Sequence, residues 1–158
     1  MSSRHVVAAL LPLLVGTSAI AQTCPCGTGT LVTSSTQLKT LLSSNTVCAA
    51  AGSDTWQEYH DPSGTLTDYK RGPSDPVDPS QIVGTWSVLA GGGISRSGVL
   101  VRYDYGSGGV YQYSVCQVSA NSVNFCGSTG SRNVTGATLQ SGPGACISSA
   151  PGGALKSR

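Results

Sequence analysis

Three consecutive strand candidates between Val99 and Cys126 constrain the fold more than any other part of this chain. In the first candidate, successive side chains point to opposite faces of an extended backbone, and the residue types on the two faces differ as in a half-buried strand. The glycine-rich run 106–109 permits the positive φ of a tight turn, and a second turn is expected at 119–122. The sequence therefore predicts an antiparallel three-strand meander. The residues that share one face of it are Val99, Val101, Tyr103, Tyr105, Tyr111, Tyr113 and Val115.

A second hairpin is predicted upstream of this meander. Thr55–His60 and Thr65–Lys70 flank Asp61-Pro62-Ser63-Gly64, whose residue types suit a type I turn. Further strands are predicted at Ile82–Leu89 and Val134–Leu139, and Thr46–Ala49 is expected to be a short strand or an extended link.

One short helix is expected near the N-terminus, over Ser35–Leu42. Ser34 and Gln37 have the spacing of a capping box, and Leu38, Leu41 and Leu42 repeat at helical spacing. Together these elements predict an all-β fold, a small antiparallel barrel or sandwich with one short N-terminal helix.

The first residues are typical of a secretory leader. The apolar run Val6–Val15 follows Arg4, and Ala19-Ile20-Ala21 has the small-x-small form of a cleavage site. We therefore expect a signal peptide over 1–21, one β-rich domain over 22–149 and a disordered tail over 150–158. The mature chain is expected to be secreted or periplasmic and to contain no membrane span.

All six cysteines follow the predicted cleavage point, which in an exported chain indicates a disulfide-stapled fold. Several pairings are open. Cys116 and Cys126 lie on neighbouring strands of one hairpin, so they are candidates for a direct bond, with Cys48 joined to Cys24 or Cys26. A bond between Cys126 and Cys146 competes with that arrangement.

Charged residues make up only 10 % of the chain. The mature part has a net charge of about +1, and Lys70-Arg71 is its largest basic cluster. This composition does not indicate nucleic-acid binding. We find no cofactor or metal signature.

Four short features together resemble a group of exported proteins. They are the helix and following residues Leu38–Thr46, the Trp56–Thr65 hairpin, the Gly84-Thr85-Trp86 strand and the Tyr113–Cys116 strand. This order resembles small exported bacterial proteins with lipocalin-like or avidin-like sheets, many of unknown function. The resemblance implies a small antiparallel barrel that holds a ligand in its interior or at one end, and it implies no catalytic residue.

The first functional hypothesis is a non-enzymatic binding or inhibitor module. A rigid disulfide-bonded sheet would present aromatic side chains to a small ligand, a glycan or a partner protein, because aromatic rings bind such surfaces with little loss of entropy. The candidate ligand-binding residues are Trp56, Tyr59, Trp86, Tyr103, Tyr111 and Tyr113.

The second hypothesis is a small exported hydrolase. Glu58 and His60 share a strand face, and Asp68 is expected on the opposite strand, so these residues are candidates for acid and base roles. A third hypothesis, a structural or assembly protein of the cell exterior, fits the Gly, Ser and Thr content and requires an exposed strand edge.

Overall fold

The computed structural model describes residues 26–51, 54–69, 80–90, 98–128 and 131–146. The predicted leader, the tail from residue 150 and the proline-rich connection 72–79 lie outside these ranges. Within them, one helix and nine strands follow in the order β1 Thr30–Leu31, α1 Ser35–Leu42, β2 Asn45–Ala51, β3 Asp54–His60, β4 Thr65–Asp68, β5 Gln81–Ala90, β6 Val99–Asp104, β7 Val110–Ser119, β8 Ser122–Gly127 and β9 Val134–Ser141, with a 3₁₀ turn over Gly106–Gly108.

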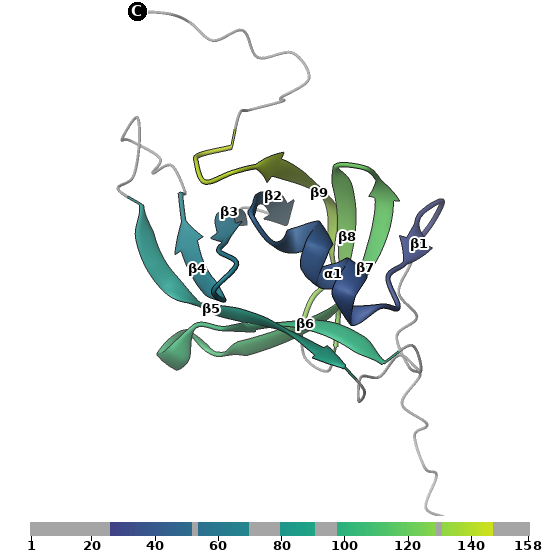
Figure 1. Ribbon diagram of the computed structural model, residues 1–158, viewed down its shortest axis with the longest axis horizontal. Coiled ribbons are helices and arrows are strands. Elements are labelled where there is room, and N and C mark those ends of the chain that lie inside the picture. The colour runs from purple at the N-terminus through teal and green to yellow at the C-terminus, as the bar shows by residue number, and fades with distance from the viewer. Residues whose placement is uncertain (1–25, 52–53, 70–79, 91–97, 129–130, 147–158) are drawn as a thin grey trace, which may run out of the picture.

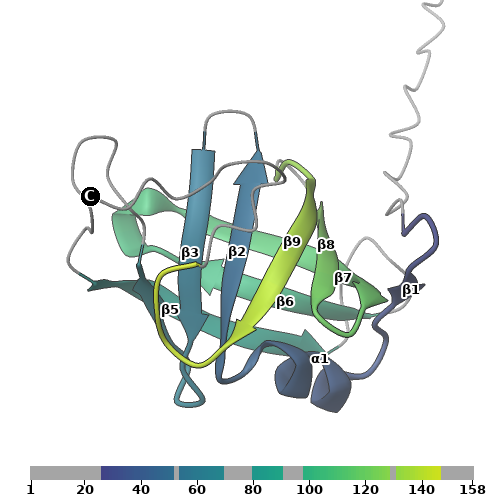
Figure 2. The same ribbon diagram turned by 90° about the horizontal axis from the view of Figure 1, so that it is seen from above.

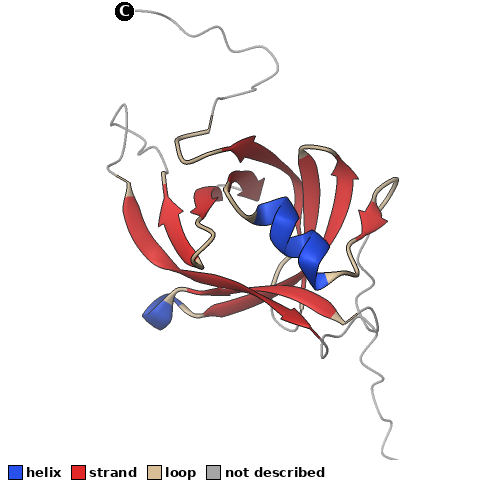
Figure 3. Ribbon diagram, viewed as in Figure 1, coloured by secondary structure: helices blue, strands red, loops and turns tan. Residues whose placement is uncertain are grey.

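The sheet closes into an up-and-down barrel (Figure 1). Each strand from β2 to β9 pairs antiparallel with the next strand along the chain, and β9 pairs back with β2. The short β1 pairs with Cys116 and Gln117 of β7, which lie beyond the residues of β7 that pair with β6. The predicted all-β fold is confirmed, and the structure has the barrel form of the two alternatives (Figure 3).

The alternation in β6 and β7 determines which side chains fill the barrel. Val101 pairs with Tyr113, and Tyr103 pairs with Tyr111, so the apolar and aromatic faces of both strands point inward. Gly106 and Gly109, with φ of 60° and 102°, make the turn between these strands. On β5, a side chain at Gly84 would collide with the backbone carbonyl oxygen of Asp104, so this close approach to the end of β6 requires glycine.

Helix α1 fills one end of the barrel (Figures 1 and 2). Its bounds are those predicted, and the Ser34 hydroxyl accepts the cap hydrogen bond from the Gln37 amide at 3.3 Å. Leu38 and Leu42 are fully buried in the core, against side chains of the surrounding strands. The Asn45 side chain, at the start of β2, donates to the Leu41 carbonyl and so ties the end of the helix to the barrel.

Two disulfides join segments that are distant in the sequence. Cys26 is bonded to Cys116, which fastens the segment before β1 onto β7. Cys48 is bonded to Cys146, which fastens the segment after β9 onto β2. Cys126 is also disulfide-bonded.

The expected bond between Cys116 and Cys126 is therefore wrong, as are the alternatives that joined Cys48 to Cys24 or Cys26 and Cys126 to Cys146. The strand register explains the first error. Cys116 lies opposite Asn124, and Cys126 lies opposite Ser114, so the two cysteines are two positions out of register. A hairpin predicted from sequence indicates which strands are neighbours, but it does not specify this offset.

Among the described residues, no helix has the length and apolar character needed to cross a membrane.

We predict that peptide mapping of the unreduced protein will recover the Cys26–Cys116 and Cys48–Cys146 links. Removing the second bond with Cys48→Ser and Cys146→Ser together should lower the free energy of unfolding by about 2–5 kcal/mol, because that bond closes a long loop. Recovery of a Cys116–Cys126 peptide from native protein would contradict the register described above.

We also predict that Leu38→Ala lowers the free energy of unfolding by about 3 kcal/mol, because it leaves a cavity where the helix meets the barrel core. Thr40→Ala, at an exposed position of the same helix, is the matched control and should change stability by less than about 0.5 kcal/mol. Denaturant unfolding curves compare the two variants, and equal effects would show that the helix does not fill the barrel end.

Candidate functional site

A cavity of about 770 Å³ lies inside the barrel. The helix fills the end where β2 begins and β3 ends, whereas the cavity is lined by Ala49 from late β2 and by Thr55 and Trp56 from early β3. The cavity is therefore at the end of the barrel away from α1. The barrel is a cup that is closed by the helix and hollow at the other end.

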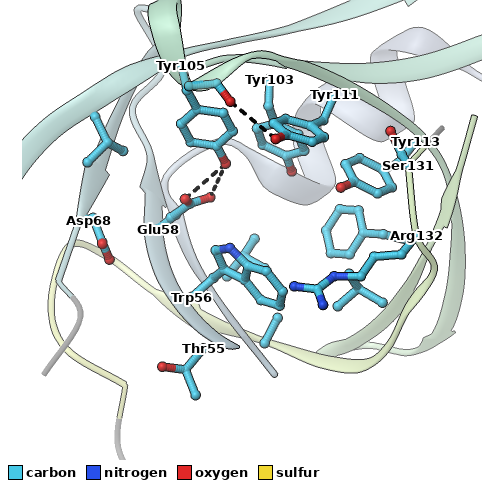
Figure 4. A pocket seen from close by; sticks show the side chains of 16 residues that line it. Thr55, Trp56, Glu58, Asp68, Tyr103, Tyr105, Tyr111, Tyr113, Ser131 and Arg132 are labelled. Carbon is cyan, nitrogen blue, oxygen red and sulfur yellow. Dashed lines mark hydrogen bonds between the residues drawn. The ribbon is translucent and has the colours of Figure 1, made fainter. Parts of the chain in front are cut away.

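Aromatic rings form much of the cavity wall (Figure 4). Tyr103 lies edge to face with Tyr113 and Phe125, at centroid distances of 5.9 and 6.3 Å, and Tyr105 lies edge to face with Tyr111 at 5.9 Å. These arrangements are the favourable ones for aromatic pairs, so the rings hold one another in place. The result is a preformed wall that exposes ring faces and hydroxyl groups to the cavity.

Glu58 is the buried acid of this cavity. It lies on the inward face of β3 and is 8 % exposed. The Tyr105 hydroxyl is 2.9 Å from each of its carboxyl oxygens. Burial raises the pKa of Glu58 to about 7; the hydrogen bond from Tyr105 partly opposes this rise, and the negative charge of Asp68, its register partner on β4, adds to it.

His60, two residues further along β3, is fully buried at the helix end rather than in the cavity wall. Its Nδ1 is 3.0 Å from the Glu58 carbonyl oxygen, which can only accept, so Nδ1 carries the proton. Nε2 therefore accepts from the Tyr103 hydroxyl at 2.9 Å. Burial lowers the pKa of His60 to about 4, so the ring is neutral near pH 7, with both nitrogens in hydrogen bonds.

Trp86 packs in the same closed part of the barrel. Its ring lies 5.0 Å from the His60 ring, and its indole N–H donates to the Asp61 carbonyl at 2.9 Å. Only 5 % of the residue is exposed, and it does not line the cavity. Trp86 thus holds the β3–β4 turn against β5.

On the opposite side of Trp56 from Glu58 in the view of Figure 4, Arg132 reaches into the cavity. Its guanidinium carbon is 5.1 Å from the centre of the Trp56 ring, within the range of a cation–π contact. The residue before it in the chain is Ser131. Both residues also line the cavity, so the segment just before β9 contributes polar groups to it.

The structure brings most of the predicted site residues to one place. Six of them line the cavity: Trp56, Glu58, Asp68, Tyr103, Tyr111 and Tyr113.

The other three predicted residues do not line the cavity. Tyr59 is half-buried on the outward face of β3, and His60 and Trp86 belong to the core at the helix end. Sequence reasoning also omitted Tyr105, Phe125 and Arg132 from the candidate site. Tyr105 shared the inward face with Tyr103, and that signal was sufficient to include it; Arg132 lies in a connection, where no periodicity indicates direction.

The chain matches no protein-family model, no curated protein and no solved structure. Within the described ranges, no group of three or more His, Cys, Asp or Glu side chains is arranged to hold a metal ion.

The two perturbed groups of β3 predict an unusual pH dependence of stability. The Glu58 pKa is raised from 4.5, so its contribution is present below pH 4.5 and is lost as the pH rises to about 7. The His60 pKa is lowered from 6.5, so its contribution is present above pH 6.5 and is lost as the pH falls to about 4. Between these limits the two contributions oppose each other.

We therefore predict that Glu58→Gln reveals the histidine contribution. The free energy of unfolding of this variant should fall by roughly 2–3 kcal/mol relative to the wild-type profile between pH 6.5 and pH 4.5. Urea unfolding at several pH values measures this difference. Asp104→Asn removes an acid that has a lowered pKa and does not line the cavity. The pH profile of its free energy of unfolding should run parallel to that of the wild type between pH 6.5 and pH 4.5. Parallel profiles for all three proteins would contradict the raised pKa of Glu58.

Proposed function

We propose that this protein is an exported, non-enzymatic binding protein that takes a small molecule with an aromatic or apolar body into the barrel. The observation that carries the proposal is the cavity itself, with Trp56 and the tyrosines of β6 and β7 in its wall. Rings at fixed positions bind apolar or planar surfaces with little further loss of side-chain entropy.

The size and type of the cavity support a small-molecule ligand. A volume of about 770 Å³ is within the range of pockets that enclose small molecules, and a mainly apolar wall with a few polar groups is their usual composition. Eight-stranded barrels are wide enough to hold one small ligand, as in lipocalins and streptavidin. The closed meander of β2–β9 therefore supports, as part of our proposal, the lipocalin-like or avidin-like character that the sequence resembles.

The disulfides support export. Disulfides persist in oxidising compartments and are rare in reducing ones. The two bonds here join residues 90 and 98 positions apart. We therefore propose a secreted or periplasmic location, in agreement with the predicted leader.

The geometry favours binding over the two other hypotheses. A hydrolase that uses Glu58, His60 and Asp68 needs the imidazole to reach a substrate, but both His60 nitrogens are engaged by Glu58 and Tyr103 behind the cavity wall. An assembly protein that adds strands needs a long free edge, but ring closure pairs every strand from β2 to β9 on both sides.

We predict that a neutral aromatic dye, N-phenyl-1-naphthylamine, binds in the cavity and becomes fluorescent. Trp56→Ala should weaken this binding about tenfold, because it removes a ring from the wall. Tyr59→Ala is the matched control, since it removes an aromatic side chain from the outward face of the same strand, and it should change the dissociation constant less than twofold.

Fluorescence titration of the three proteins, each shown to be folded by circular dichroism, measures these values. Absence of dye binding, or an equal loss in both variants, would count against a ligand site in the barrel.

A further inference from the structure

The Glu58 carboxyl group has unused hydrogen-bonding capacity in the cavity. Among the described residues, Tyr105 is the only side chain that hydrogen-bonds its two oxygens. A hydroxyl group has one hydrogen, so Tyr105 serves one oxygen at a time, whereas a carboxylate accepts about four hydrogen bonds. Glu58 also lines the cavity, so a ligand there can reach the remaining lone pairs.

The charges around Glu58 favour a cation. Its register partner Asp68 adds a second negative charge to the same wall. Within the described part of the chain, Glu58 forms no ion pair, and the cationic side chain of the cavity, Arg132, lies over the Trp56 ring. A positive charge brought by a ligand to Glu58 would therefore reduce the repulsion that Asp68 exerts on its carboxylate.

The rings beside Glu58 add to this preference. Tyr105, whose hydroxyl meets the carboxyl group, is stacked at 6.4 Å from Tyr103 and lies 5.9 Å from Tyr111. Ring faces attract cations and also bind apolar groups, so the same wall suits both the charged end and the body of one molecule.

We propose that the ligand of the cavity is a small protonated amine with an aromatic or apolar body, whose ammonium group donates hydrogen bonds to the Glu58 carboxylate. This inference depends on the proposed function and specifies its ligand class. The ammonium nitrogen lies at the Glu58 carboxylate, and the body of the ligand packs on Trp56 and the tyrosine rings.

The proposal implies that binding depends on pH through Glu58. The ionisable groups that face it are Tyr103 of β6, Tyr105 just after β6, Tyr113 of β7 and Asp68 of β4, with His60 two positions further along its own strand. The pKa values of the three tyrosines are raised by burial, and that of His60 is lowered to about 4, so none of these four groups titrates between pH 6 and pH 8. Glu58, with a pKa of about 7, does.

Three probes with the same ring and similar length test the charge preference: 2-phenylethylamine, 2-phenylethanol and 3-phenylpropionate. Calorimetry, and competition with N-phenyl-1-naphthylamine, give their affinities for the oxidised protein. At pH 8 we expect the amine to bind at least tenfold more tightly than the alcohol, because a charge-assisted hydrogen bond is stronger than a neutral one. Lowering the pH to 6 should weaken amine binding about tenfold and leave the alcohol unchanged.

Glu58→Gln keeps the shape of the side chain and removes its charge. It should weaken amine binding at pH 8 about tenfold and change alcohol binding less than twofold. Asp104→Asn, which removes an acid that is paired with Arg102 and does not line the cavity, is the matched control and should leave both affinities unchanged. If Glu58→Gln does not fold, the pH series on the wild type decides between the outcomes.

Equal affinities for amine and alcohol, or tighter binding of phenylpropionate, would overturn the amine proposal and leave a ligand site of another preference. Dye binding that none of the three probes displaces would also overturn the amine proposal while the proposed function stands. Failure of the dye and all three probes to bind would overturn both.

Discussion

The antiparallel pairing of β2 with β9 is the contact on which the structure depends. Val47 lies opposite Leu139 and Thr46 opposite Gln140, and these pairs turn a meander into a closed ring. Closure creates an inside and an outside. On each strand, alternate side chains therefore fill or line the barrel, and the others face out. The Cys48–Cys146 bond holds β2 to the segment after β9 and thus reinforces the closing contact.

The two ends of the barrel interior hold buried polar groups in different ways. At the helix end, His60 is neutral and both its nitrogens have partners, so its burial is compatible with a packed core. In the hollow end, Glu58 has one hydroxyl partner and a like charge across the strand pair. The chain thus changes from packed core to cavity wall within one strand, over the two positions from His60 to Glu58.

Much of the fold could be predicted because its signals are local. The capping serine and the leucine spacing predict α1 at about its observed bounds, and the Asp61–Gly64 turn predicts the β3–β4 hairpin. The disulfide pairs could not be predicted, because they depend on strand register and on which distant strands close the ring.

The candidate site was predictable in part for the same reason. Alternation shows which residues point inward, and it correctly groups Trp56 with Glu58 and Tyr103 with Tyr113. Tyr59 has the opposite phase on β3, so its aromatic character was the wrong reason to include it. Trp86 has the right phase, but alternation cannot show how far along the barrel axis a residue lies, and Trp86 is at the filled end.

The composition gives Glu58 its significance. The chain has seven acidic residues in all, and Glu58 is its one glutamate. Burial of a carboxyl group in a wall of aromatic rings destabilises its charged form, and an apolar side chain at this position would extend the packing of Val47 and Trp56. The ionised form of an acid at position 58 therefore lowers the stability of the fold. A cationic group brought by a ligand would reverse that balance, since it would make the same carboxylate a source of affinity.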